Sequence, residues 1–477
     1  MCRGQDGPTA QRPTCLVKKE NTVSLYELLS KRQEQDNPVK VGVIGAGKFS
    51  SMFLSQVMLS PGIQVVGIAD LKIPNIYSAC KHIGWPQENI REVKNANEIN
   101  DMAKKGLVAA VNDAMELIAS DCEVILEVTG NPIAGTLHAA KAIQAHKHVV
   151  MVSVEADCMV GPLLTDMAER EGVKFSMAYG DQPALILEMI DWARAIGFEV
   201  VCAGKGTRFQ PEYHYSTPDT IWGYYGFSEE MVKSGDYNAK MFNSFLDGTK
   251  SAIEMTAVAN GAGLQAPEQG LGFPPISFYH LQDVLKPTER GGILPKAGMV
   301  ECVASEDRYK APIDDNIRFG VYVTLHAPTP YVKRCFKEYG VKVDSTGEYA
   351  ALYRPYHFIG LELNISVASV ALRHESTGSS LYFCADVATK AKKDLVPGEI
   401  IDGEGGYTVY GSATTSDFSL KNGLLPLGLS HGAKVIRAVK KDAPLTYKDV
   451  EINETTMAFQ LRREMETRAR NGEFRLA

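Results

Sequence analysis

Two kinds of segment alternate along the first two fifths of the chain. Short apolar runs of the buried-strand type are separated by stretches in which apolar residues recur at helical spacing. Strands alternating with helices favour a mostly parallel sheet that is covered on both faces. The predicted strands are 40–45, 64–69, 108–111, 124–128, 148–154, 174–178 and 199–203, and the predicted helices are 51–59, 133–145, 162–170 and 184–196.

The pattern then changes twice. Residues 207–247 are rich in aromatic side chains with few clean periods, and they precede predicted helices at 249–260 and 356–372 and a strand at 318–326. Residues 381–450 show short β-type runs broken by Gly and Pro turns, which indicates a small all-β domain. The charged segment 457–470 predicts a surface helix, and residues 25–31 predict a short amphipathic helix.

These segments predict an α/β protein with five parts. A polar segment at 1–37 combines a disordered tail, residues 1–20, with the short helix. A doubly wound parallel sheet follows at 38–200, then an inserted α+β catalytic domain at 201–380 and a small β domain at 381–455. The tail is 456–477.

Composition narrows the class of protein. The 477 residues are 45% apolar and 22% charged, which is typical of a globular chain rather than a disordered one. The 50 Lys and Arg against 57 Asp and Glu give a net charge of -7, which argues against nucleic acid as a partner. We therefore expect a small-molecule substrate.

The location of the protein is predicted from three features. The first residues lack the apolar core of a signal peptide, and no apolar run reaches the ~18 residues that a membrane span needs. The nine cysteines form no C-x-x-C pair and are widely spaced, as in a reducing compartment. We expect a cytoplasmic protein that does not bind membranes.

A glycine turn after the first strand is the strongest local signal. Gly45 suits the tight turn, Gly47 allows the backbone to approach a pyrophosphate, and Ser50 takes the third position of the motif. The turn opens a helix, whose first amides attract phosphate. The motif therefore predicts a Rossmann-type dinucleotide site, with contacts from Gly45, Ala46, Gly47, Lys48, Phe49 and Ser50.

Asp70 ends the second strand at about the expected distance from this turn. A carboxylate there accepts hydrogen bonds from the ribose hydroxyls of NAD and repels a 2′-phosphate. NAD is therefore the predicted cofactor. Lys72 leaves NADP open, although we interpret it as a solvated lysine.

Two further loops follow predicted strands. Thr129, Gly130 and Asn131 come after the strand at 124–128, where a parallel sheet places the nicotinamide. Glu155 and Asp157 follow the next strand. We interpret Asp157 as a cap of the helix at 162–170 and Glu155 as a functional carboxylate.

Polar side chains at later turns are candidates for acid–base chemistry. Asp181 follows the strand at 174–178 and is either a general base or an N-cap. Lys205 lies between two glycines at the predicted end of a strand, where its ammonium could bind phosphate or serve a carbonyl oxygen as an acid.

The second half adds three more candidates. Lys296 lies in a Gly- and Pro-containing loop, and Arg354 and His357 could bind an anion and relay a proton. Glu254 and Asn260 are polar residues on one apolar helix and need partners there. The spacing of His and Cys residues predicts no metal site.

Together these motifs resemble the homoserine-dehydrogenase-like oxidoreductases with a C-terminal SAF domain. This family includes the second type of 1-deoxy-D-xylulose 5-phosphate reductoisomerase, the reductoisomerase-like enzymes. The resemblance covers about residues 24–455. It is carried by Gly-Ala-Gly at 45–47, Glu155-Ala-Asp157 with Gly161-Pro162, Gly180-Asp181, Ala203-Gly-Lys-Gly206 and Arg354-Pro-Tyr-His357.

The resemblance implies a Rossmann domain, an inserted catalytic domain and a small β-clip (SAF) module, in a homo-oligomer. It implies that Lys205, Asp181, Glu155, Lys296, Arg354 and His357 line the active cleft. Two departures bear on the activity. Asp70 stands where the NADP-dependent members carry basic residues, and Gln182-Pro-Ala-Leu185 replaces their Glu-Pro-Ser-Ser.

Four functions follow as hypotheses. The leading one is an NAD(P)-dependent dehydrogenase or reductase for a small polar hydroxy or keto compound, with a sugar phosphate among the candidates. The alternatives are 1-deoxy-D-xylulose 5-phosphate reductoisomerase activity, in which a divalent metal could take part, homoserine dehydrogenase activity, and a non-catalytic protein that binds a cofactor or carbohydrate.

Overall fold

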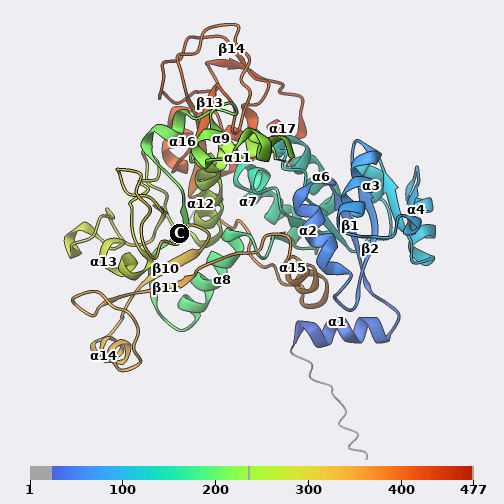
Figure 1. Cartoon of the computed structure of the whole chain (residues 1–477), viewed down its shortest axis with the longest axis horizontal. Coiled ribbons are helices and arrows are strands. Elements are labelled where there is room, and N and C mark those ends of the chain that lie inside the picture. The colour runs from blue at the N-terminus through green and yellow to red at the C-terminus, as the bar shows by residue number, and fades with distance from the viewer. Residues whose placement is uncertain (1–23, 235–236, 475–477) are drawn as a thin grey trace, which may run out of the picture.

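The computed structural model describes residues 24–234 and 237–474, so the tail predicted at residues 1–20 lies outside the described ranges. Figure 1 shows three parts. A seven-stranded sheet with its helices lies to the right, a four-stranded sheet lies to the lower left, and a smaller β unit lies at the top. Helix α12 (Thr249–Ala262) runs through the middle.

All pairings in the seven-stranded sheet are parallel, and the strand order is β3-β4-β2-β1-β5-β6-β7. Strand β1 lies between β2 and β5, so the order reverses beside it and leaves a crevice at the carboxyl ends of β1 and β5. The elements of this part are α1 (Leu25–Glu34), β1 (Val39–Ile44), α2 (Lys48–Val57), β2 (Ile63–Ala69), α3 (Ile73–His82), β3 (Ile90–Glu92), α4 (Ala96–Lys104), β4 (Val108–Val111), α5 (Ala114–Ile118), β5 (Val124–Glu127), α6 (Pro132–Gln144), β6 (His148–Met151), α7 (Val154–Arg170) and β7 (Phe175–Met177).

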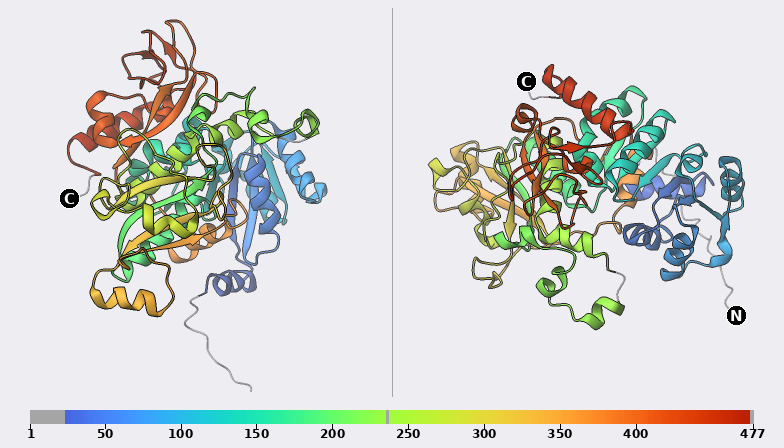
Figure 2. Two further views of the ribbon diagram at one scale, coloured as in Figure 1. Left: turned by 60° about the vertical axis from the view of Figure 1, so that its left-hand side comes forward. Right: turned by 90° about the horizontal axis from the view of Figure 1, so that it is seen from above.

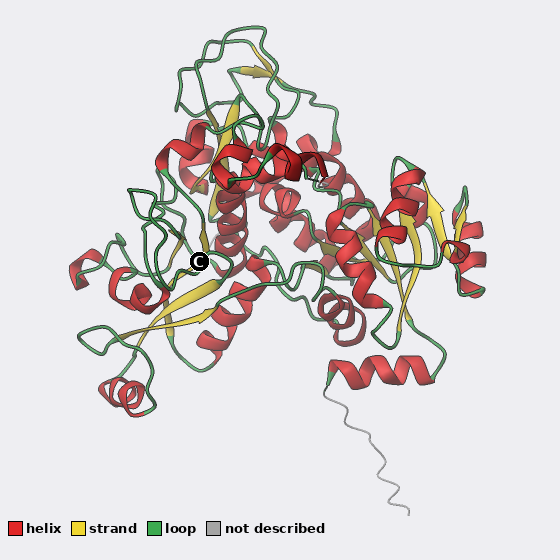
Figure 3. Ribbon diagram, viewed as in Figure 1, coloured by secondary structure: helices red, strands yellow, loops and turns green. Residues whose placement is uncertain are grey.

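Helices cover both faces of this sheet, as Figure 3 shows. One face packs on α2 and α3 through Phe53 and Ile76, and the other packs on α5 and α6 through Leu117 and Ile143, all buried. Apolar side chains on both faces explain why the strands read as continuous apolar runs. The predicted doubly wound α/β fold is confirmed.

The strand predicted at 199–203 does not continue the first sheet. It is β8 (Glu199–Thr207), which pairs antiparallel with β10 and parallel with β9 in a four-stranded sheet of order β11-β10-β8-β9. An apolar run does not reveal which sheet a strand joins, because pairing depends on strands far along the chain. The elements of this part are α8 (Gln182–Ala195), β8, α9 (Ile221–Tyr225), α10 (Glu229–Ser234), α11 (Ala239–Leu246), α12, α13 (Leu281–Val284), β9 (Met299–Ala304), β10 (Val321–His326), α14 (Pro330–Glu338), β11 (Tyr349–Arg354) and α15 (Asn364–Ala368).

Two predicted helices differ in extent. Helix α7 begins at Val154, eight residues before the predicted start, and accommodates Pro162 in its interior. The helix predicted at 356–372 forms only from Asn364, as α15 followed by a π-helical turn at Ser369–Arg373. Gly360 adopts a φ of +79°, which is incompatible with a continuous helix across it.

The C-terminal part is built on the antiparallel pair β12 (Ala385–Ala391) and β13 (Val409–Thr415). It also contains α16 (Ser416–Asn422), the short pair β14 (Lys434–Val435) and β15 (Val450–Glu451), and the final helix α17 (Met457–Arg470). Seen from above, its strands lie over the middle of the molecule (Figure 2).

Helix α17 occupies the residues predicted for a surface helix, but it is not only a surface element. It packs on α6 and α7, and its Arg462 is completely buried, with ion pairs to Asp386 at 2.5 Å and Glu466 at 2.9 Å. The sequence did not reveal the buried face of α17, because a charged residue in a buried ion pair cannot be distinguished from a solvated one by its position in a charged pattern.

Candidate active site

The glycine turn has the geometry that a dinucleotide requires. Gly45 adopts a φ of +109°, and a Cβ there would lie 3.0 Å from the carbonyl oxygen of Val128. Gly47 caps α2, and nothing lies within 4 Å of the Cβ that a side chain would place there. Buried Ser50 donates its hydroxyl to the carbonyl of Gly47 at 2.7 Å. The space above Gly47 and the first amides of α2 fit a pyrophosphate.

Asp70 is fixed beside this turn. Its carboxylate accepts hydrogen bonds from the amide of Ala46 at 3.0 Å, the amide of Lys72 at 2.9 Å and the side-chain amide of Asn75 at 3.0 Å. The side chain of Lys72 is exposed. The carboxylate therefore lies where this fold binds the adenosine ribose.

Buried Glu127 organises the loops after β5 and β6. Its carboxylate accepts from the hydroxyl of Thr129 at 2.6 Å and from the hydroxyl of Ser153, which in turn accepts from the amide of Gly130 at 2.8 Å. Asn131 caps α6 by accepting from two amides of its first turn. These bonds fix the predicted cofactor loop at the crevice.

A cavity of about 600 Å³, which we call the cleft, joins all three parts of the chain. The first sheet contributes the glycine turn and the loops after β5 and β6. Helices α11 and α12 form the opposite wall, and one residue comes from the C-terminal part. The lining includes Gly47, Lys48, Phe49, Thr129, Gly130, Ser153, Glu155, Lys240, Ser244, Lys250 and Glu404.

Two neighbouring lysine–carboxylate pairs involve α12, and of their four side chains Lys250 and Glu155 line the cleft. Lys250 from α12 forms an ion pair with Glu155 from the first turn of α7, and Lys205 from β8 forms one with Glu254, one turn after Lys250. Burial acts to lower the pKa of Lys250, but the carboxylates around it, led by Glu155 and Glu254, outweigh burial and raise it. The cluster thus holds a firmly protonated amine at the cleft.

Asp181 interacts with the same charged groups, although it is not among the residues that line the cleft. Burial, together with the charge of Glu254, raises its pKa to about 6, against the opposing effects of Lys250 and His357. It also caps α8 by accepting from the amide of Gln182 at 2.8 Å. The structure therefore shows Asp181 as a cap of α8, and its role as a general base stays a prediction.

The glycines beside Lys205 have a packing reason. A Cβ at Gly204 would lie 1.7 Å from the carbonyl oxygen of Glu301, and one at Gly206 would lie 2.1 Å from that of Ile317. Lys205 lies within β8 rather than at its end, because the strand continues to Thr207. The glycines allow close strand packing, and Lys205 is not among the residues that line the cleft.

The remaining candidates are spread more widely. Arg354 ends β11 and donates to Glu362 at 2.5 Å, and half-buried His357 is hydrogen-bonded to the carbonyl of Phe319 at 2.7 Å. His357 lies near enough to Asp181 to lower the pKa of that carboxyl. Lys296 is exposed in the loop before β9 and is not among the residues that line the cleft.

The prediction that Asp157 caps a helix is wrong, because α7 begins before it. Asp157 lies inside the first turns, buried, and accepts from the hydroxyl of Ser380 at 3.1 Å. Burial raises its pKa to about 7. Asp157 therefore joins α7 to the segment that leads into the C-terminal part.

The sequence interpretation missed Lys250, Lys240 and Glu404. A signal existed for Lys250, since it lies four residues before Glu254 on an otherwise apolar helix and so shares its face. No comparable signal marked Glu404, which lies in a glycine-rich loop. Only the fold brings that loop to the cleft.

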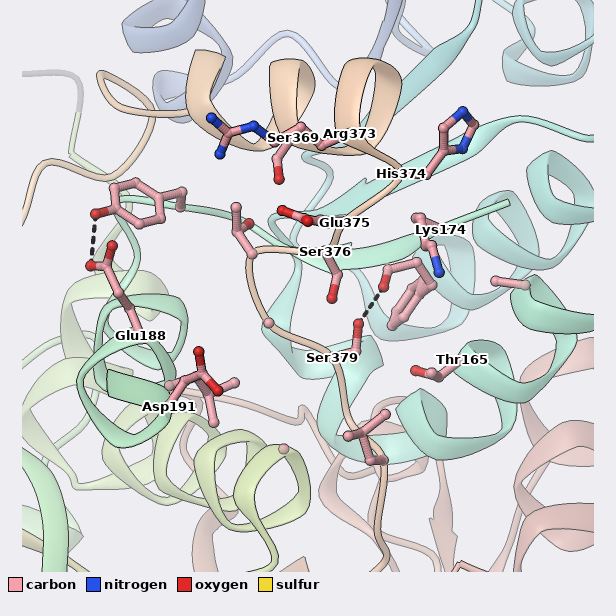
Figure 4. Close-up of a pocket in the computed structure, with 18 of the residues that line it drawn as sticks. Thr165, Lys174, Glu188, Asp191, Ser369, Arg373, His374, Glu375, Ser376 and Ser379 are labelled. Atoms are coloured by element: carbon pink, nitrogen blue, oxygen red, sulfur yellow. Dashed lines mark hydrogen bonds between the residues drawn. The ribbon is translucent and has the colours of Figure 1, made fainter. Parts of the chain in front are cut away.

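A larger cavity, of about 960 Å³, lies beside β7 (Figure 4). Acidic and basic side chains share its lining, among them Glu188, Asp191 and Arg373. The hydroxyl of Tyr179 donates to Glu188 at 2.8 Å, and that of Ser379 donates to the carbonyl of Phe175 at 2.6 Å. This cavity contains none of the glycine-turn residues, so we place the active site in the cleft.

Within residues 24–234 and 237–474, no three His, Cys, Asp or Glu side chains are grouped as a metal site would need. In the same ranges, no helix has both the length and the apolar character needed to cross a membrane.

Comparison with known proteins supplies independent information. Residues 180–363 match the family model described as the catalytic domain of oxidoreductase DRL, which is less than half of the chain. No curated protein sequence matches the chain.

Solved structures resemble parts of the fold. They include 1-deoxy-D-xylulose 5-phosphate reductoisomerase from Zymomonas mobilis in complex with NADPH (15% identity, 46% of this chain and 57% of that chain, TM-score 0.31). Another is the 3-ketoreductase KijD10 from Actinomadura kijaniata (15% identity, 37% of this chain and 48% of that chain, TM-score 0.25). A third is scyllo-inositol dehydrogenase from Lactobacillus casei (12% identity, 42% of this chain and 51% of that chain, TM-score 0.25). The chain spans about half the length of these structures, and likenesses this distant carry no argument about activity. The family match over residues 180–363 shows that the middle of the chain is similar to an oxidoreductase catalytic domain.

Proposed function

We propose that the protein is an NAD(P)-dependent oxidoreductase acting on a small polar hydroxy or keto compound in the cleft. The observation that carries the proposal is the position of the Lys250–Glu155 ion pair, which faces the same cavity as Gly47 and the loop at Gly130. Bound NAD(P) supplies or accepts the hydride at its nicotinamide ring. The Gly47 turn would hold the pyrophosphate, and Asp70 would hold the adenosine ribose.

The floor of the cleft can serve the reacting oxygen. When hydride adds to a carbonyl carbon, the oxygen gains negative charge and then one proton, and oxidation of an alcohol reverses both changes. The Lys250 ammonium would stabilise this charge, since a preorganised donor in a buried site favours the charged transition state. Asp181, with a pKa near neutrality, would exchange the proton. Glu254, which forms an ion pair with Lys205, would help to position Lys250 and Asp181.

Two finer assignments are part of the proposal. We infer that the C-terminal part is a SAF-like β-clip, which the antiparallel pair β12–β13 and its turn-rich connections support. We also infer a homo-oligomer in the cytoplasm, as the resemblance and the cysteine pattern imply. The cysteines within the described ranges are free thiols, in keeping with a reducing compartment.

The proposal is tested by assaying the purified full chain with NADH and NADPH against ketoses and keto sugar phosphates, and with NAD+ and NADP+ against polyols and homoserine. Oxidation of a reduced cofactor by a keto compound, or reduction of an oxidised cofactor by an alcohol, dependent on both substrate and Lys250, would support it. A protein that binds neither cofactor would contradict it, and a protein that binds cofactor without turnover of any class would favour the non-catalytic alternative.

A further inference from the structure

A loop of the C-terminal part, residues 402–408, has a closely defined conformation. The carboxylate of Asp402 accepts from the amides of Tyr407 at 2.6 Å and Thr408 at 3.0 Å. Gly405 adopts a φ of +63°, and a Cβ there would lie 1.9 Å from the carbonyl oxygen of Lys240 on α11. The loop is therefore shaped to lie directly against α11.

Buried polar contacts hold the loop in that place. Asn243 of α11 donates to the carbonyl of Gly405 at 2.9 Å, and Lys240 donates to that of Asp402 at 3.1 Å. The buried ammonium of Lys392 donates to the carbonyl of Gly406 at 2.9 Å and forms an ion pair with Asp247 at 2.7 Å. Breaking such buried contacts is costly, so the loop is a fixed wall.

Glu404 projects from this loop at a boundary between two cavities. It lines the cleft, and it also lines a neighbouring cavity of about 680 Å³, together with Glu155 and Lys240. The second cavity is bounded mainly by apolar side chains of α6, α12 and the C-terminal part, including Ile133, Leu137, Ile253, Leu427 and Met457.

The surroundings of Glu404 favour its neutral form. Burial and the charge of Glu155 raise its pKa to about 8, whereas Lys250 and a hydrogen bond from Ser244 oppose the shift. Because Lys250 is already paired with Glu155, it does not fully compensate a second carboxylate. The charged or titratable groups that face Glu404, or share a cavity wall with it, are Lys48, Glu155, Cys158, Tyr237, Lys240, Asp247, Lys250, Asp402 and His431.

We propose that Glu404 is an active-site residue that the C-terminal part contributes, and that its carboxyl group donates a hydrogen bond to a hydroxyl or carbonyl oxygen of the substrate. The inference rests on the proposed function. It also specifies the substrate further: the part that reaches Glu404 carries a hydroxyl or carbonyl oxygen that can accept a hydrogen bond.

The test compares Glu404→Gln, which keeps the size and a donor but cannot ionise, with Glu404→Leu, which removes the donor. Glu451→Gln, an exposed residue of the same part, is the matched control. For the best substrate of the wild-type protein, kcat/KM should fall above about pH 8 as Glu404 ionises. Glu404→Gln should lose this fall, and Glu404→Leu should raise KM about tenfold at neutral pH, with NADH affinity unchanged.

A fall above pH 8 that persists in Glu404→Gln, together with an unchanged KM in Glu404→Leu, would overturn the proposal. A second readout does not need a substrate. A carboxyl whose folded pKa is raised contributes stability that is complete below its unfolded pKa near 4.5 and is lost as pH rises through about 8.

Glu404→Gln should therefore gain melting temperature relative to wild type between pH 5 and pH 9, and Glu451→Gln should not. If this gain appears but no substrate is turned over, the proposed function alone has failed, and Glu404 remains an acid in the cleft wall. If the gain is absent, the placement of half-buried Glu404 against Glu155 is contradicted.

Discussion

In the proposed mechanism, Lys250 is the residue that stabilises the negative charge on the substrate oxygen. It lines the cleft, whereas Lys205 does not line it and is paired with Glu254. Replacing Lys250 with Met should lower kcat by about 10²–10⁴-fold, because the substrate oxygen loses its cationic partner. Steady-state kinetics check this, with Lys333→Met on the surface helix α14 as the control. Near-normal turnover in Lys250→Met would return the role to Lys205.

We expect Asp181 to make the rate of alcohol oxidation depend on pH near pH 6. With a pKa of about 6, it is ionised above that pH and can accept a proton from an alcohol. The rate of alcohol oxidation should therefore rise with pH through about 6. Asp181→Asn should remove this rise and lower the rate by about 10²-fold or more. A pH–rate profile checks this, and an unchanged rising limb in the variant would show that another group titrates there.

We expect Asp70 to control the choice between NAD and NADP. Its carboxylate lies beside the glycine turn, where it would bind ribose hydroxyls and repel a 2′-phosphate. Wild-type protein should bind NADH more tightly than NADPH, and Asp70→Ala should bring the two affinities closer together. Fluorescence titration measures both. Tighter binding of NADPH by the wild-type protein would contradict the assignment.

At the scale of elements, the sequence predicted the first sheet well and the placement of charged helices poorly. Buried apolar runs identify parallel strands, so β1, β2, β5 and β6 appeared close to their observed positions. Helix α17 was interpreted as a surface helix, although Arg462 lies in the core. Periodicity cannot distinguish a solvated arginine from one that meets Asp386 from another element.

This buried pair leads to a prediction for α17. Arg462→Met would leave Asp386 and Glu466 buried without their cation, which typically costs about 3–5 kcal/mol. Urea unfolding should show a loss of this size, and Arg463→Met, at a half-exposed neighbouring position, should cost much less. Restoring stability with Asp386→Asn in the Arg462→Met background would assign the loss to the uncompensated carboxylate.

At the scale of the whole molecule, the site is assembled from three parts of one chain. The glycine turn, Asp70 and the β5 and β6 loops were predictable, because strand-turn-helix chemistry is local. Glu155, Asp181 and Lys205 were predicted one by one, and the fold brings them into one cluster. Glu404 could not be predicted from the sequence, since its position depends on long-range contacts between the loop at 402–408 and α11.

The central claim is that the cleft binds a nicotinamide dinucleotide above Gly47, and a direct titration tests it. Gly47 has open space around its Cβ position, so Gly47→Leu should leave the melting temperature unchanged while filling the pyrophosphate space. Gly223→Leu, at an equally open position on α9, is the control. We predict saturable NADH or NADPH fluorescence changes for the wild-type and Gly223→Leu proteins, and binding weakened at least tenfold in Gly47→Leu. Equal binding in all three proteins, or no binding in the wild type, would contradict the account.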